Sequence, residues 1–209
     1  MLLTIISGLL ICLSLITSYK EFKKDTSIIK QVYLKRGWDY LKALGLVLIV
    51  STFVITIYSL PLPAFLTWSW LSLFSEQPTN VMLQPFSSGS VIFIILFWFI
   101  LSLSVPYLAK LEEETFRSNK FTQKDRIKTS IIFGLLHMTM GVNLSIAIII
   151  GLMGYIYSIF YVSGFKKSNS QDFEIQDQLG IVYSTSIHAK YNFILITIVA
   201  TLSLLACFY

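Results

Sequence analysis

Long apolar runs constrain this chain more than any other feature of its sequence. A helix that crosses a bilayer needs about 20 mainly apolar residues in succession, and the sequence contains several runs of that length. Only 13% of the residues are charged, whereas soluble domains carry about 25%. We therefore predict one all-α membrane domain over residues 1–209, a polytopic transmembrane helical bundle.

The runs predict about six spans plus interfacial helices. They are residues 1–18, 43–60, 90–109, two helices within 130–165, and 184–209. The fourth run is too long for one span, and the "MGVNLS" segment at 140–145 supplies the break. Segment 21–42 alternates apolar and basic residues at nearly helical spacing, which is typical of an interfacial helix. The Trp-rich segment 61–74 is expected at the interface or as a re-entrant segment.

The basic residues test this topology, because Lys and Arg favour cytoplasmic loops. With six spans and both termini outside, all sixteen Lys and Arg residues fall on one side. We therefore predict an integral membrane protein whose partner is the lipid bilayer. The net charge of +5 follows this topology, and no nucleic-acid partner is expected.

The segment "LEEETFR" at 111–117 places three adjacent carboxylates after an apolar run. On a helix, Glu113 and Arg117 are spaced i and i+4 and can form an ion pair. Glu112 is rotated by about 100° from Glu113, so it can point elsewhere and act as a general base or acid. Glu114 also reaches Arg117 by spacing alone. The alternative interpretation is a solvated charge cluster at a helix end.

The two histidines lie in or beside apolar segments. His137 follows Lys128 by about ten residues, which places it about 15 Å from the cytoplasmic edge, and Phe133 lies one turn earlier on the same face. His188 begins the last predicted span and shares a face with Asn192, so that this pair can donate hydrogen bonds to an oxyanion. The alternative for each histidine is a hydrogen bond between helices.

All these segments lie on the cytoplasmic side of the predicted topology, so Glu112, His137, His188 and Asn192 can converge. The set supplies a base and oxyanion donors, without a Ser or Cys nucleophile that has a recognisable partner. This favours attack on an amide by an activated water. No cofactor is expected; a divalent metal is the alternative, although the HExxH spacing is absent.

Three short motifs occur in order: EExxxR (Glu112, Glu113, Arg117), FxxxH (Phe133, His137) and HxxxN (His188, Asn192). Together they resemble the CPBP family, which comprises CAAX proteases and bacteriocin-processing proteins and is also called Abi. The resemblance covers residues 108–209, whereas the spans of residues 1–107 carry no recognisable motif.

This resemblance implies a glutamate-type intramembrane endopeptidase. Glu112 and His137 would activate water, Glu113 and Arg117 would hold the site together, and His188 and Asn192 would form an oxyanion hole. It leaves Glu114 outside the set. It also implies a peptide or membrane-protein substrate, lipidated or not. From the predicted topology we expect the active site to face the cytoplasm, in a protein of a bacterial plasma membrane.

Two other classes of function remain open. A catalytically silent membrane protein, of bacteriocin-immunity or scaffold type, would use the same residues only for structure. A transporter would be expected to carry polar residues through the full membrane depth, whereas the outer halves of these predicted spans are almost free of charge.

Overall fold

The chain is helical throughout the part that the structure describes. The computed structural model describes residues 2–34, 36–73, 86 and 90–208. Its α-helices are α1 (Leu2–Lys24), α2 (Ser27–Tyr33), α3 (Trp38–Tyr58), α4 (Ala64–Thr67), α5 (Val91–Arg117), α6 (Gln123–His137), α7 (Leu144–Lys166) and α8 (Phe173–Ala206). Two short 3-10 helices are also present: η1 (Trp70–Leu73) follows α4, and η3 (Met138–Met140) lies between α6 and α7. The predicted all-α fold is confirmed for these residues.

Four of the described helices, α3, α5, α7 and α8, are long and apolar enough to cross a membrane. The two further predicted spans are not confirmed by these criteria. Helix α6 has only 15 residues, fewer than the roughly 20 that a perpendicular crossing needs. Helix α1 covers most of the predicted span 1–18, but Met1 and several of the side chains lie outside the described part.

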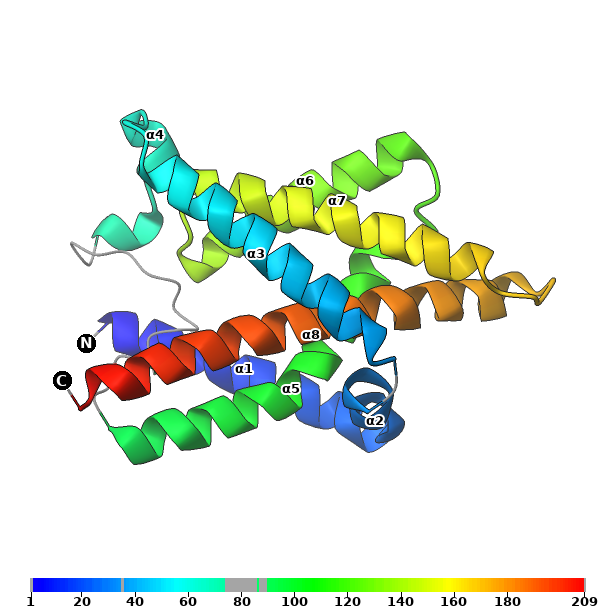
Figure 1. Ribbon diagram of the computed structural model, residues 1–209, viewed down its shortest axis with the longest axis horizontal. Helices are drawn as coiled ribbons and strands as arrows, with labels where there is room; N and C mark the ends of the chain where they lie inside the picture. The colour runs from blue at the N-terminus through cyan, green and yellow to red at the C-terminus, as the bar shows by residue number, and fades with distance from the viewer. Residues whose placement is uncertain (1, 35, 74–85, 87–89, 209) are drawn as a thin grey trace.

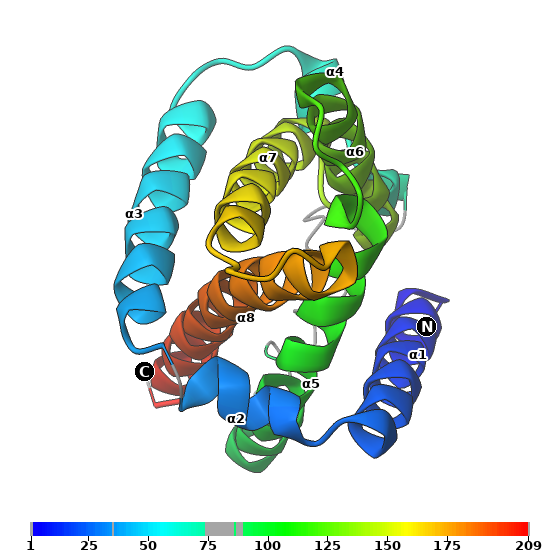
Figure 2. The ribbon, with the colours of Figure 1, turned by 90° about the vertical axis from the view of Figure 1, so that its right-hand side faces the viewer.

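Helix α8 is the central element of the bundle. It packs against α2, α3, α5 and α7, while α6 packs mainly on α7 and α1 on α5. Figure 2 shows α8 surrounded by its neighbours, with α1 at the periphery beside α5. A residue on α8 can therefore meet side chains from both halves of the sequence.

The chain runs back and forth along the long axis of the molecule. Both chain ends lie at one end of this axis, and the connections from α3 to α4 and from α6 to α7 lie in the same half (Figure 1). The connections α1–α2, α5–α6 and α7–α8 lie in the opposite half. The connections that the sequence predicted to be basic thus lie in the same half of the molecule.

Helices α5 and α8 extend well beyond the apolar runs that predicted them. Helix α5 continues past residue 109 to Arg117, and α8 begins at Phe173 instead of near 184. Asp172 starts α8 because its carboxylate accepts hydrogen bonds from the backbone N–H groups of Glu174 and Ile175. His188 therefore lies well inside the last helix and not at its start, which corrects the sequence prediction.

The predicted break between α6 and α7 is confirmed. After η3, the side chain of Asn143 accepts a hydrogen bond from the N–H of Ile146 and caps α7. The Trp-rich segment packs on this turn: Ser69 Oγ donates to the carbonyl of Gly141 at 2.5 Å, and Trp70 Nε1 donates to that of Met138 at 2.7 Å.

Pro106 lies inside α5 and removes the backbone N–H that would bond to the carbonyl of Ser102. The Tyr33 hydroxyl of α2 donates to that carbonyl at 2.5 Å. Burial raises the pKa of the Tyr33 phenol, so the donor keeps its proton. Helix α2 thus satisfies a backbone group of α5 that the proline leaves open.

Candidate active site

The last turns of α5 place two carboxylates and a guanidinium on adjacent faces. Glu113 and Arg117 are completely buried, and Glu113 Oε2 lies 3.5 Å from Arg117 Nε. The predicted i, i+4 ion pair is therefore present, although these two atoms do not form a hydrogen bond. Glu114 is 45% exposed and lies 3.6 Å from Lys110, so it stays outside the site, as the motif register implied.

His188 of α8 lies between the two carboxylates. Its Nδ1 is 2.8 Å from Glu113 Oε1, and its Nε2 is 3.5 Å from Glu112 Oε2. An imidazolium would donate to both carboxylates, and with Arg117 the group would then carry equal positive and negative charge. Both ring nitrogens thus face carboxylates, an arrangement that the sequence did not predict.

Aromatic rings enclose the histidine. The Tyr157 ring of α7 stacks on His188 with centroids 4.2 Å apart and planes at 18°. The Phe133 ring of α6 lies 6.0 Å from His188 and 4.9 Å from the Arg117 guanidinium carbon. This packing needs Gly154, because a Cβ there would lie 2.8 Å from Phe133 Cδ1 and 3.1 Å from Arg117 Nη2.

His137 occupies the C-terminal end of α6, one turn after Phe133. The two rings contact each other with centroids 4.6 Å apart, as the FxxxH spacing predicted. The Nδ1 atom lies 2.8 Å from the carbonyl oxygen of Phe133. Because a carbonyl only accepts, Nδ1 carries the proton, and Nε2 of the neutral ring is left as an acceptor.

Site residues from α5, α6 and α8 line a cavity of about 360 Å³. This volume is within the usual range of ligand pockets. Glu112, His137, His188 and Asn192 all line it, together with Phe133 and Tyr157. The cavity wall is otherwise mainly apolar, from residues such as Leu108 and Met153. Within the described part of the chain the Asn192 amide has no hydrogen-bond partner, so it can serve a ligand in the cavity.

Glu113 and Arg117 lie behind this wall and do not line the cavity. The structure therefore brings all six predicted residues together, in two layers. Glu112, with 28% of its side chain exposed, can reach a water in the cavity, whereas Glu113 is completely enclosed. A carboxylate held by a histidine beside an apolar cavity is suited to general acid–base chemistry.

A metal site was the alternative for these groups. Among the residues that the structure describes, no group of three or more His, Cys, Asp or Glu side chains is arranged to hold a metal ion. The site's nearest pair of candidate ligands, Glu113 and His188, is already joined by a hydrogen bond.

Sequence reasoning missed Tyr157, which is 1% exposed and makes the closest ring contact with His188. A signal was present: Gly154, Tyr157 and Tyr161 are spaced i, i+3 and i+7 on one face of α7. Tyr161 binds elsewhere, since its hydroxyl donates to Asp177 and accepts from the backbone N–H of Asn119. This contact ties the residues after α5 to α7 and α8.

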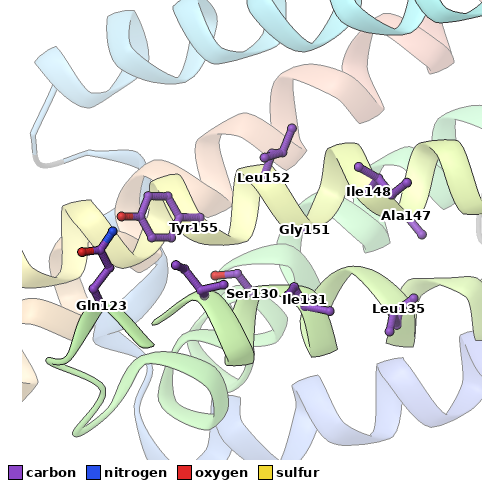
Figure 3. A pocket seen from close by; sticks show the side chains of 10 residues that line it. Gln123, Ser130, Ile131, Leu135, Ala147, Ile148, Gly151, Leu152 and Tyr155 are labelled. Atoms are coloured by element: carbon purple, nitrogen blue, oxygen red, sulfur yellow. The ribbon is translucent and has the colours of Figure 1, made fainter. Parts of the chain in front are cut away.

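Another cavity, of about 460 Å³, lies between α6 and α7 (Figure 3). Gln123 and the Tyr155 ring lie at one end of it, and Leu135 and Ala147 lie toward the other. Its lining contains neither a carboxylate nor a histidine. We therefore assign the candidate chemistry to the cavity that holds Glu112.

Comparisons of the chain with family models, with curated proteins and with solved structures found no match.

Proposed function

We propose that the chain is an intramembrane endopeptidase of the CAAX-protease type, which hydrolyses a peptide bond with an activated water. The observation that carries the proposal is the clamp of His188 between Glu112 and buried Glu113, at the wall of an apolar cavity. The order of the three motifs, which resembles the CPBP family, points to the same chemistry.

In the proposed reaction, Glu112 and the free nitrogen of His137 hold a water molecule against the substrate amide. Glu112 accepts a proton from the water as the oxygen attacks the carbonyl carbon, and then passes that proton to the leaving amine. Asn192 donates to the developing oxyanion, with His188 as the second donor that the motif implies. Glu113 holds His188 in place through its hydrogen bond to Nδ1, and Arg117 in turn pairs with Glu113.

The proposed membrane arrangement has six spans, with α1 and α6 joining the four helices that meet the length and apolarity criteria. It is supported by the direction of the chain, whose basic connections gather in one half of the molecule. The site would then open to the cytoplasmic side of a bacterial plasma membrane. Its substrate would be a peptide or a membrane protein, lipidated or not.

The test is cleavage of a quenched fluorescent peptide panel by the purified protein, with and without a chelator. We expect Glu112→Gln to insert and fold normally but to lose about 10²–10⁴-fold in rate, the usual contribution of an acid–base group. Glu114→Gln is the matched control, because it removes an adjacent but exposed carboxylate, and it should cleave like wild type. Equal cleavage by Glu112→Gln and wild type would end the proposal.

One observation favours a second function, a catalytically silent membrane protein of immunity or scaffold type. Nδ1 of His188 is hydrogen-bonded to Glu113, and Nε2 faces Glu112 at 3.5 Å. These contacts would also suit a cluster whose role is to join α5 to α8. In that case no peptide would be cleaved, and Glu112→Gln and His137→Ala would leave the cellular phenotype of the gene unchanged.

A further inference from the structure

A third cavity, of about 320 Å³ and lined by charged residues, opens where α3 begins and α7 ends, beside the first turns of α8. Nothing in the proposed reaction uses it. The residues of its lining that matter here are Arg36, Trp38, Asp39, Lys42, Lys167 and Tyr183. Three of these carry a positive charge and one carries a negative charge.

The three cations converge on a single aromatic ring. Arg36 Cζ lies 5.0 Å, Lys42 Nζ 4.8 Å and Lys167 Nζ 4.9 Å from the centroid of Tyr183. Like charges at such separations repel each other. Asp39 forms an ion pair with Lys42 at 3.0 Å, and among the described residues Arg36 and Lys167 have no ion-pair partner. The pocket therefore carries an excess of positive charge.

Buried groups hold two of these residues, Arg36 and Lys42, in place. Asp39 is 2% exposed and accepts a hydrogen bond from Ser186 Oγ at 2.9 Å. The ammonium of Lys190, which is completely buried, donates to Ser186 Oγ at 2.9 Å and to the carbonyl of Arg36 at 3.2 Å. Arg36 has a φ of 61°, which is uncommon for a residue other than glycine. Its unusual backbone is thus fixed by a buried charge on α8.

The surroundings of the pocket indicate which kind of anion fits. Trp38 at the rim is 78% exposed, and Leu41, one turn further along α3, is 59% exposed. Both α3 and α7 are long and apolar enough to cross a membrane. A ligand here would meet cations with its anionic end and apolar helix surface with the rest. A free phosphate ion would use only the first of these features.

We propose that this pocket binds the phosphate headgroup of an anionic membrane lipid, with the acyl chains against α3. Basic pockets between membrane helices on the cytoplasmic side are known to suit such headgroups, and exposed Trp residues commonly mark the interfacial depth. The proposal does not depend on peptidase activity, because none of its residues belongs to the candidate active site.

The test uses the full chain, purified and delipidated in dodecyl maltoside. Phosphatidylglycerol and phosphatidylcholine with identical acyl chains are titrated in mixed micelles, and bound lipid is measured by native mass spectrometry and by the thermal unfolding midpoint. We expect phosphatidylglycerol to bind and to raise the midpoint more than phosphatidylcholine. Lys167→Gln and Arg36→Gln should each weaken its binding about fivefold, the effect of one basic residue near an anionic lipid.

Lys166→Gln is the matched control, because Lys166 is the exposed neighbour of Lys167 and does not line the pocket. It should bind phosphatidylglycerol like wild type. Equal losses for Lys166→Gln and Lys167→Gln would overturn the proposal in favour of diffuse attraction, as would equal binding of the two lipids. Inorganic phosphate forms a further arm: a midpoint shift as large as that of the lipid would identify a soluble anion as the ligand instead.

Discussion

Removing the carboxylate of Glu113 tests whether the site depends on a buried ion pair. Glu113 and Arg117 are both completely buried, with Nε and Oε2 3.5 Å apart. Glu113→Gln keeps the shape of the side chain and leaves the guanidinium without its counter-ion. Breaking a buried pair from one side costs about 3–5 kcal/mol, because the remaining charge stays desolvated. We expect a loss of that size in the free energy of unfolding.

The double variant Glu113→Gln/Arg117→Met separates the pair from its surroundings. It removes both charges, so it should cost no more than the larger single change, and the coupling energy should be about 3 kcal/mol. The free energy of unfolding is measured in dodecyl maltoside micelles with increasing dodecyl sulfate, followed by far-UV circular dichroism. Each variant is compared with wild type under the same conditions.

Glu114→Gln is the control for this cycle. Its carboxylate is 45% exposed and lies 3.6 Å from Lys110, and exposed pairs contribute about 0–1 kcal/mol. A cost for Glu113→Gln as small as that for Glu114→Gln would contradict a buried, coupled ion pair. So would single costs that simply add in the double variant, because the two charges would then be independent.

Two further predictions concern the packing that positions the site. Gly134→Ala should lower the free energy of unfolding by about 1–3 kcal/mol, because its Cβ would lie 2.3 Å from the backbone oxygen of Ala147. Gly45→Ala meets nothing within 4 Å and should be neutral or stabilising by the same detergent unfolding assay; a comparable loss would contradict the packing argument. Tyr33→Phe should cost about 1–3 kcal/mol, since it leaves a buried carbonyl of α5 without its donor. Tyr19→Phe, at a ring that is 58% exposed, should cost almost nothing, and equal costs would refute the role of the hydroxyl.

Spacing within one helix was readable from the sequence. The contacts between Glu113 and Arg117 and between Phe133 and His137 each follow from an i, i+4 separation. Contacts between helices could not be predicted, because they depend on the position of one helix along the axis of another. The hydrogen bond between His188 and Glu113 joins residues 75 positions apart, and apolar periodicity carries no information about that register.

The ends of the helices were the other feature that the sequence predicted wrongly. Hydropathy marks the stretch that lipid can cover, but the backbone hydrogen bonds of a helix continue wherever polar residues are held by neighbours. Arg117 remains helical because it is buried against Glu113, and α8 extends back to the cap at Asp172. The basic pocket could not be predicted from the sequence either, because it joins residues such as Lys42 and Tyr183 that are 141 positions apart.

The hydrogen bond from Tyr33 to Ser102 also bears on the order of biogenesis. During synthesis α2 leaves the ribosome before α5, so the phenol is already present when the proline-containing helix enters the membrane. A truncated protein that begins at α5 would retain all three motifs but would insert that helix with one backbone acceptor unmatched. The first half of the chain, although it lacks any motif, would thus act as an intramolecular assembly factor for the second.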